Sequence, residues 1–419
     1  MSDCSVLSDS RLQPLHGPTQ GLRVLFLLLG RRGAMPRLAL QLARAGADRN
    51  DLETAFALSR HNDLIGDFAF LGRKLLSLDT IDACSPVRTI RNFNLASRLI
   101  ASSIEAWRPD VVINLCPHVW TPLLIAGIRR MGVPCITVMH DATGHPGDPG
   151  ACLAPWFRRE ARVADSIITL SRFVAGELVR LAVAPITRIS TLFLPDLAYG
   201  TTKTTPVWAG DTPLKLLFFG RLLKYRGLAL LLDALDALER DGVRVELTVA
   251  GAGTSGTAAA RLSSRRAEFL NRWIDEAEIG PLLARHDAVV ASHLECSQSG
   301  VVAAAFGSGL PVIALPVGGL VEQVFDGRTG VLAQAADAPA LANAVRRLAE
   351  NANLYGSICA HLQSTTHQRS TARVQEALLA CLRPTARVLT PLTGGMRRAP
   401  PHVTAARVTN ELAIPRVCR

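Results

Sequence analysis

Short apolar runs recur along the chain in two series, and this pattern constrains the fold more than any other feature of the sequence. The runs are Leu22–Leu29, Val111–Leu115, Pro134–Met139 and Ser166–Leu170 in the first series, and Leu214–Phe219, Val245–Ala250, Ala288–Ser292 and Pro311–Leu315 in the second. They are rich in Val, Ile and Leu and lack polar alternation, which is typical of strands buried on both faces of a parallel sheet. Stretches of helical periodicity separate them. We therefore predict an α/β protein with two doubly wound, Rossmann-like domains.

A segment rich in Gly, Thr and Pro, Tyr199–Pro213, lies between the two series and suits a linker. The 419 residues are enough for two cores of about 150–200 residues each. The predicted divisions are a disordered N-terminal extension (1–20), a first domain (21–200), a linker (201–213), a second domain (214–383) and a poorly ordered basic tail (384–419). One helix, around Val374–Leu382, is expected to cross back to the first domain.

The charge balance favours anionic partners. Lys and Arg outnumber Asp and Glu by 46 to 35, and the net charge of +11 suits phosphates, acidic lipid headgroups or nucleic acid. Nucleic acid is disfavoured because stacking aromatic residues are lacking on a basic face. The nine cysteines are dispersed without a CxxC pair, which favours a reducing cytosol and argues against zinc. The apolar run near the start is far short of the roughly 20 residues that span a bilayer, and a signal peptide is disfavoured.

The turn after the first strand of the second domain carries two arginines. The strand LKLLFFG leads directly to Arg221 and Arg226, and an apolar helix begins after Gly227. Guanidinium groups and the free N–H groups of a helix start both bind phosphate, so this turn is a candidate diphosphate site. The alternative interpretation, that both arginines are solvated turn residues, fits this segment equally well.

A second motif follows the run Ala288–Ser292. It reads ECSQSG from Glu295 to Gly300, and its small residues let a ligand approach the backbone where the next helix begins. Glu295 can accept hydrogen bonds from sugar hydroxyls. A helix start chosen only for close packing would explain the small residues but not the acid. A third motif repeats this logic with a strand, the turn Gly318-Gly319 and a helix that carries Glu322.

These motifs together resemble a known family. The segments FFGRLLKYRGLALLLDAL, VAGAG and ECSQSGVVAAAFGSGLPVIALPVGGLVEQVFDGRTGVL are similar to the second domain of GT-B glycosyltransferases of family 4, a retaining group with many bacterial cell-surface polysaccharide enzymes. The first domain resembles the family more loosely, through LGRRGAMPRLALQLA, PDVVINL, PCITVMHD and ADSIITLSRFVAGEL. The resemblance implies a GT-B fold, in which two Rossmann-like domains face a central cleft.

The resemblance also implies roles for individual residues. Glu295 and His140 would be the catalytic residues, with Glu295 in contact with the donor sugar and His140 in the cleft near the reacting sugar. Gly33 would let the donor phosphates approach the first domain. The implied donor-binding residues are Gly33, Arg221, Arg226, Ser299, Gly300, Val301, Gly318, Gly319 and Glu322.

The sequence departs from the family pattern at two places. Position 226, usually Lys, is Arg, which keeps the charge but changes its geometry. The second glutamate of the family's paired-glutamate motif, which typically binds the nucleotide ribose, should fall at Ala303 or Ala304. Ribose recognition is therefore unassigned.

The implied activity is transfer of a sugar, with retained configuration, from a nucleotide sugar such as a UDP- or GDP-sugar to a saccharide or lipid-linked saccharide acceptor. We expect no cofactor and no metal, because arginines supply the positive charge and no DxD-like pair of carboxylates lies in a suitable loop. We expect a cytoplasmic protein, peripheral at the inner face of the plasma membrane, that does not bind nucleic acid. Two alternatives remain open: an inactive GT-B scaffold protein, suggested by the missing glutamate, and a GT-B nucleotide-sugar epimerase.

Overall fold

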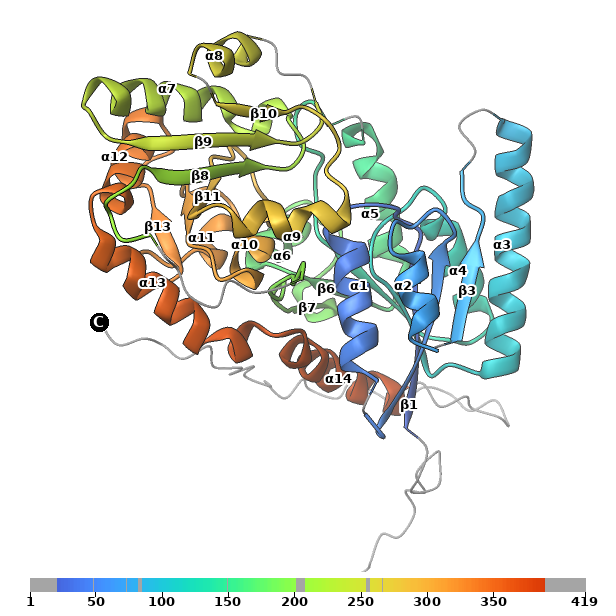
Figure 1. The fold of residues 1–419 in the computed structure, drawn as a ribbon. Helices are drawn as coiled ribbons and strands as arrows, with labels where there is room; N and C mark the ends of the chain where they lie inside the picture. Colours follow the sequence, from blue (N-terminus) through green and yellow to red (C-terminus); the bar gives the residue numbers. More distant parts are fainter. Residues whose placement is uncertain are drawn as a thin grey trace, which may run out of the picture.

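The computed structural model describes residues 21–388 except 48, 73, 82–84, 149, 201–207, 254–256 and 266. These residues form two α/β lobes, each built on one parallel sheet (Figure 1). The predicted fold class is therefore confirmed. The predicted extension 1–20, most of the predicted tail and part of the predicted linker lie outside the described residues.

The sheet of the first lobe has seven strands in the order β3-β2-β1-β4-β5-β6-β7. Its strands are β1 (Leu22–Leu28), β2 (Leu52–Ser59), β3 (Lys74–Leu78), β4 (Val111–Asn114), β5 (Cys135–Met139), β6 (Ser166–Thr169) and β7 (Ile189–Thr191). The helices of this lobe are α1 (Ala34–Ala45), α2 (Ile65–Phe70), α3 (Pro86–Trp107), α4 (Thr121–Arg130), η1 (Ala151–Leu153), α5 (Ala154–Val163), α6 (Arg172–Arg180) and η2 (Ile186–Arg188), where η marks a 3₁₀ turn.

The sheet of the second lobe has six strands in the order β10-β9-β8-β11-β12-β13. Its strands are β8 (Leu214–Phe219), β9 (Val245–Ala250), β10 (Glu268–Leu270), β11 (Ala288–Ala291), β12 (Val312–Ala314) and β13 (Gly330–Leu332). The helices that follow β8 are η3 (Lys224–Arg226), α7 (Leu228–Arg240), α8 (Ala258–Ser264), α9 (Glu276–Ala284), α10 (Gly300–Gly307), α11 (Leu320–Gln323), α12 (Ala338–Ala349), α13 (Ala352–Ser364), η4 (Thr366–Arg369) and α14 (Thr371–Val388).

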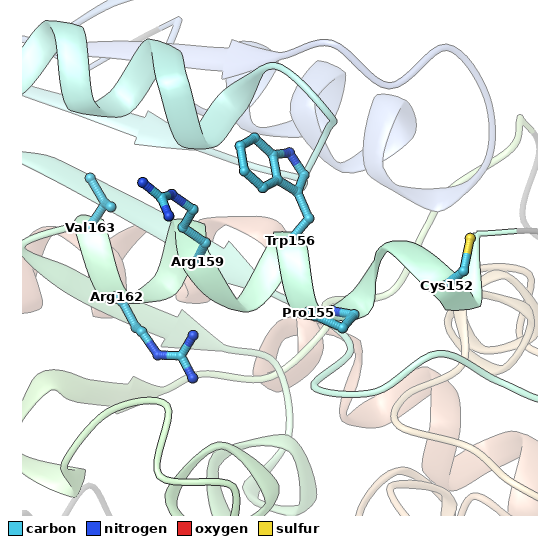
Figure 2. A pocket seen from close by; sticks show the side chains of 6 residues that line it. All are labelled: Cys152, Pro155, Trp156, Arg159, Arg162 and Val163. Atoms are coloured by element: carbon cyan, nitrogen blue, oxygen red, sulfur yellow. The ribbon is translucent and has the colours of Figure 1, made fainter.

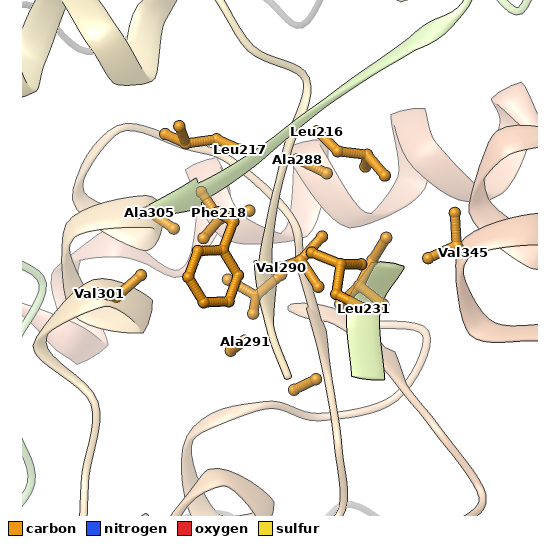
Figure 3. Close-up of a cluster of buried hydrophobic side chains, with 14 of the residues drawn as sticks. Leu216, Leu217, Phe218, Leu231, Ala288, Val290, Ala291, Val301, Ala305 and Val345 are labelled. Atoms are coloured by element: carbon orange, nitrogen blue, oxygen red, sulfur yellow. The ribbon is translucent and has the colours of Figure 1, made fainter. Parts of the chain in front are cut away.

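Burial of the apolar runs explains why these segments form strands. All eight runs predicted from the sequence are strands, and the residues of β11 are all buried. In the second lobe, side chains of β8 and β11 pack against α7, α10 and α12, as Figure 3 shows for Phe218, Val290 and Leu231. Burial of this apolar surface is the main favourable term in folding each lobe.

The strand order places the functional edge of each sheet. In both sheets the order reverses beside the first strand of the lobe, between β1 and β4 and between β8 and β11. In open parallel sheets, ligands bind at the carboxyl ends of the strands at such a reversal. The turns after β1, β8 and β11 contain Gly33, Arg221 and Glu295, respectively.

The last described helix joins the two lobes. After the second lobe is complete, α14 returns along the first lobe and lies beside α1 (Figure 1). Val374, Leu378 and Leu382 are buried in the same cluster as Phe26 of β1. A helix crossing back was expected, but α14 continues four residues past Pro384, where the sequence predicted weak order. None of the helices in the described part of the chain has both the length and the hydropathy needed to cross a bilayer.

Candidate functional site

Two helix starts meet where the lobes face each other. Gly33 is the N-cap of α1 with φ +94°, in the left-handed region that favours glycine, and Ser299 is the N-cap of α10. A Cβ added to Gly300 would lie 2.6 Å from Cβ of Ala34. Position 300 must therefore be glycine for the two helix starts to approach this closely. Helix N-termini carry free N–H groups and partial positive charge. The pair is therefore suited to an anion held between the lobes.

Arg221 reaches across to the first lobe. Its Nη2 lies 2.8 Å from Oδ2 of Asp148, and its side chain is half-exposed at 49%. The same Nη2 lies 3.4 Å from the hydroxyl of Tyr225. Burial acts against the charge of Arg221, but its hydrogen bonds and charge interactions with Asp148 and Tyr225 together outweigh burial and raise the pKa of the guanidinium. Arg221 is thus a fixed cation at the interface, as the diphosphate hypothesis requires.

Arg226 lies deeper in the second lobe. Its guanidinium contacts the ring nitrogen Nε2 of His293 and lies against Gly220, where an added Cβ would be 2.4 Å from Nη2. Burial, followed by the charge of Arg226, holds the pKa of His293 well below its usual range, so the ring is neutral and can accept from the guanidinium. Gly220 has φ +110° and leaves room for this side chain. The two predicted arginines are thus close in sequence but have different partners: Arg221 pairs with Asp148 of the first lobe, and Arg226 contacts His293 of the second.

The loop after β5 brings acids and histidines to the same interface. His145 Nε2 donates to Oδ1 of Asp141 at 3.2 Å, and His145 Nδ1 lies 3.8 Å from Oε2 of Glu295 in the second lobe. His140 Nε2 is 3.6 Å from Oδ2 of Asp141, and its buried Nδ1 has no hydrogen-bond partner among the described residues. The structure thus brings both predicted catalytic residues, His140 and Glu295, to one cluster around Asp141 and His145.

Two more buried polar atoms without a hydrogen-bond partner among the described residues belong to this region, and one of them is Nδ1 of His293. The side-chain oxygen Oε1 of Gln298, in the SQSG turn, also lacks a partner in the part of the chain that the structure describes. Buried polar atoms are nearly always hydrogen-bonded in folded proteins. Three such atoms, on His140, His293 and Gln298, fit a site in which a polar ligand supplies the missing hydrogen bonds.

Three predicted donor-binding residues, Gly318, Gly319 and Glu322, make close contacts within the protein. The Glu322 carboxylate accepts the backbone N–H groups of Arg172 and Phe173 at 2.8 and 2.7 Å, which caps α6 of the first lobe. Cβ atoms added to Gly318 and Gly319 would lie 2.0 Å from the carbonyl oxygens of Cys296 and Ser297, respectively.

The N–H of Gly319 donates to the Cys296 carbonyl at 2.8 Å. These two glycines therefore pack against the backbone of the SQSG turn. The N–H of Gly319 is used in a hydrogen bond within the protein. Ser299 is fixed in a similar way, because its N–H donates to Oε1 of Gln323 at 2.7 Å and its hydroxyl accepts from Val302. Gly300 and Val301 begin α10 directly behind it. The donor-binding roles of these residues stay predictions.

Ala303 and Ala304, the two positions where the family's second glutamate was expected, are buried. Ala303 is 2% exposed, packs with the core cluster of the first lobe, and accepts the N–H of Leu197 at 2.9 Å through its carbonyl. Ala304 is equally buried, in the core of the second lobe. A longer acidic side chain at either position would bury a carboxylate among apolar groups. The substitution thus fits the packing of this chain.

Sequence reasoning missed His145, Asp148, Tyr225 and Gln323. The first two lie in HPGD, a few residues beyond the MHD segment, at the carboxyl edge of β5. Their place just after a predicted strand could have identified them as candidate site residues. No group of three or more His, Cys, Asp or Glu side chains among the described residues is arranged to hold a metal ion. The expected independence from metal stays a prediction.

A separate hollow lies on the first lobe, outside this cluster. It has a volume of about 600 Å³ and is lined by η1 and α5 (Figure 2). Its lining residues are Cys152, Pro155, Trp156, Arg159, Arg162 and Val163. None of them belongs to the predicted site, and Arg159 lies over the Trp156 ring at 5.7 Å.

Both lobes match known protein families. Residues 35–192 match the family described as "Glycosyltransferase Family 4", and residues 213–351 match "Glycosyl transferases group 1". A glycogen synthase from Mycobacterium tuberculosis is 31% identical over 275 residues, which are 59% of this chain and 62% of that protein. An alpha-D-kanosaminyltransferase from Streptomyces kanamyceticus is 25% identical over 259 residues, 54% of this chain and 64% of that protein. The chain thus spans less than two thirds of the length of these relatives.

The fold has solved counterparts. HepE from Anabaena, solved in complex with UDP and glucose, superposes with a TM-score of 0.67 at 17% identity and covers 86% of this chain and 99% of that one. At this identity the likeness shows the fold alone. The two domain matches and the paired parallel sheets together identify the chain as a Glycosyltransferase Family 4 domain followed by a Glycosyl transferases group 1 domain, arranged in a GT-B fold.

Proposed function

We propose that this protein is a retaining glycosyltransferase that moves a sugar from a UDP- or GDP-sugar to a saccharide or lipid-linked saccharide in the synthesis of a bacterial surface polysaccharide. One observation carries the proposal: Arg221, the Gly33 helix start and the Gly300 helix start converge between the lobes. A diphosphate there would meet one guanidinium fork and two sets of N–H groups. HepE, a structural counterpart, is described as bound to UDP-glucose in another of its crystal structures.

In the proposed reaction, the bond from the sugar's anomeric carbon to the diphosphate oxygen breaks and the acceptor hydroxyl oxygen forms the new bond. The acceptor's proton leaves with the diphosphate or to solvent. Negative charge develops on the diphosphate, where Arg221 and Arg226 stabilise it. Glu295 and His140 approach the sugar from opposite lobes, so the reacting groups are complete only when the lobes are closed. This chemistry needs positive charge at the diphosphate, which the arginines supply without a metal or cofactor.

The test is nucleotide binding and sugar transfer by Arg221→Ala. We expect calorimetry to detect UDP or GDP binding to the wild-type protein, and we expect Arg221→Ala to lower the transfer rate by roughly 100-fold or more because a charge on the leaving group loses its partner. Arg285→Ala is the matched control, because Arg285 is also 49% exposed and pairs with Glu268 at 2.8 Å. Unchanged transfer by Arg221→Ala would defeat the assignment.

The same assays separate the two alternatives. An inactive scaffold would bind no nucleoside diphosphate in calorimetry with UDP, GDP and ADP. An epimerase would release a free, epimerised sugar without any acceptor present. A transferase requires the acceptor and yields a glycosylated product.

We further propose a cytoplasmic protein that is peripheral at the inner face of the plasma membrane. The outer face of α3 supports this, because Val87 and Ile90 are 77% and 63% exposed and Arg91 and Arg98 follow on the same helix. Apolar and basic side chains on one surface helix suit an anionic bilayer. Figure 1 places α3 at the outer edge of the first lobe.

Sedimentation with phosphatidylglycerol and phosphatidylcholine vesicles tests this membrane contact. We expect salt-sensitive binding to the former only. Ile90→Glu should lose that binding, whereas the control Val179→Glu, at a partly exposed apolar residue of α6, should keep it. Failure of the wild-type protein to bind anionic vesicles would remove the membrane contact and leave the transferase proposal standing.

A further inference from the structure

His145 of the first lobe lies close to Glu295, one of the two predicted catalytic residues, and pairs with Asp141, which also neighbours the other, His140. His145 lies in the loop after β5, and only 13% of its side chain is exposed. Its ring stacks on Tyr225 of η3, with centroids 4.5 Å apart and planes inclined by 17°. The stack is a contact between lobes, because Tyr225 belongs to the turn that carries Arg221 and Arg226. His145 is therefore held in a fixed orientation at the cleft.

The two ring nitrogens of His145 face carboxylates from different lobes. Nε2 donates to Asp141 at 3.2 Å within the same loop, and Nδ1 points toward Glu295 of the second lobe at 3.8 Å. The second distance is too long for a hydrogen bond, so charge attraction dominates there. Glu295 is 55% exposed, and His145 is the one cation that pairs with it among the described residues.

We propose that His145 is a positioning residue, which links Asp141 of the first lobe to Glu295 of the second and so holds the Glu295 carboxylate where the donor sugar binds. This inference rests on the proposed function. His145 acts through Glu295 and need not touch the sugar itself. Because the link spans both lobes, it forms only when they are closed, which ties the placement of Glu295 to closure.

The charges around the ring favour its protonated form. Burial acts against the charge, but the hydrogen bond to Asp141 and the negative charges of Asp141, Glu295 and Asp148 outweigh it and raise the pKa of His145. The other titratable or charged groups nearby are Tyr225, which stacks on the ring, the neutral His293, His140 beside Asp141, and Arg221, which Asp148 binds. A protonated ring donates from both nitrogens, whereas a neutral ring donates from one. Raising the pH therefore removes one half of the link.

His145→Phe tests the proposal, because it preserves an aromatic ring over Tyr225 and removes both nitrogens. We expect the variant to fold with an unchanged melting temperature, to raise KM for the donor by roughly ten-fold, as the loss of a charge-assisted contact does, and to lose the alkaline fall in kcat/KM. His367→Phe, at an exposed histidine of η4, should behave as wild type. His145→Asn serves as a second variant if the phenylalanine disturbs folding. A wild-type pH profile in both His145 variants would overturn the proposal.

A double-mutant cycle with Glu295→Gln identifies the route of the effect. If His145 acts through Glu295, His145→Phe should add less than two-fold to the loss in Glu295→Gln, because interacting residues are not additive. Fully additive losses would overturn the proposal. Its failure is distinguishable from failure of the proposed function, since NMR titration of the His145 ring needs no turnover. We expect Glu295→Gln to lower the pKa of that ring, and an unchanged pKa would refute the link even in an inactive protein.

Discussion

Two of the groups of ion pairs between the lobes differ in their exposure to water. The connector-side pairs, Arg37–Glu276 and Asp196–Arg369, surround the segment that leaves the first sheet, and their side chains are between 8% and 18% exposed. The cleft-side pairs, Arg221–Asp148 and His145–Glu295, each include a side chain that is about half-exposed. The first group is part of the packed interior, whereas the second is open to exchange with a ligand.

The pKa values of Glu276 and Asp196 on the connector side shift in the opposite direction from those of Asp141 and Asp148 at the cleft. Burial raises the pKa of Glu276, and it raises the pKa of Asp196 to about 6 even beside Arg369. At the cleft, burial acts the same way on Asp141 and Asp148. Their hydrogen bonds and the nearby positive charges, chiefly His145 for Asp141 and Arg221 for Asp148, together outweigh burial and lower the pKa of both carboxyl groups. Loss of hydration therefore decides the carboxyl pKa values on the connector side, whereas hydrogen bonds and charge interactions decide them at the cleft. The comparison suggests that the connector fixes which surfaces meet, and that the cleft pairs hold charge ready for a substrate.

The largest expected effect is on stability, at the connector. Arg37→Ala leaves Glu276 buried without its partner, so we expect the free energy of unfolding to fall by about 3 kcal/mol or more. Urea unfolding followed by circular dichroism measures this. Arg37→Met combined with Glu276→Leu should recover most of the loss, because two apolar groups need no hydration. Equal instability of the single and double variants would contradict this account of the connector.

The next effect concerns pH and Asp196. Its folded-state pKa of about 6 lies above the usual 3.8, so folding favours the protonated form. The resulting stabilisation is complete below about pH 4 and is lost as the pH rises through 6. We expect roughly 2 kcal/mol of unfolding free energy to disappear between pH 4 and 7 in wild type but not in Asp196→Asn. Parallel stability curves for the two proteins, measured in urea at several pH values, would rule this out.

The smallest effect on stability is expected at the cleft. Asp148→Asn removes an ion pair whose arginine is half-exposed, so the free energy of unfolding should change by at most about 1 kcal/mol. The same change frees Arg221 from a competing carboxylate, and the affinity for UDP or GDP should rise by up to about five-fold. Calorimetry with both nucleotides checks this. Weaker nucleotide binding in the variant would mean that Asp148 supports the site and does not compete within it.

The sequence predicted the central strands better than the edges of the sheets. All eight apolar runs are strands because they are buried on both faces. Strands β3 and β10 lie at sheet edges, and β3 begins at the exposed Lys74, so they lack that pattern. β2 was also missed, although its residues are largely buried, because LETAFALS mixes polar and apolar letters.

The site could be predicted where chemistry and backbone lie close in sequence. Arg221 and Glu295 each follow a strand directly, so their places at the carboxyl edge were foreseeable. His145 was not, because its contact with Glu295 depends on how one lobe meets the other. Glu322 shows the same limit, since its carboxylate caps a helix that lies 150 residues earlier in the chain.

The position of helix α14 in the chain has a consequence for folding during translation. Residues such as Leu378 and Leu379 fill the core of the first lobe, yet they are translated after the whole second lobe. During synthesis, the apolar surface of the first lobe beside α1 stays uncovered until α14 has been translated. Chaperones that bind exposed apolar segments of nascent chains would therefore have access to the first lobe for longer than to the second. A premature stop codon before Thr371 would leave the core of the first lobe incompletely packed as well as truncating the chain after the second lobe.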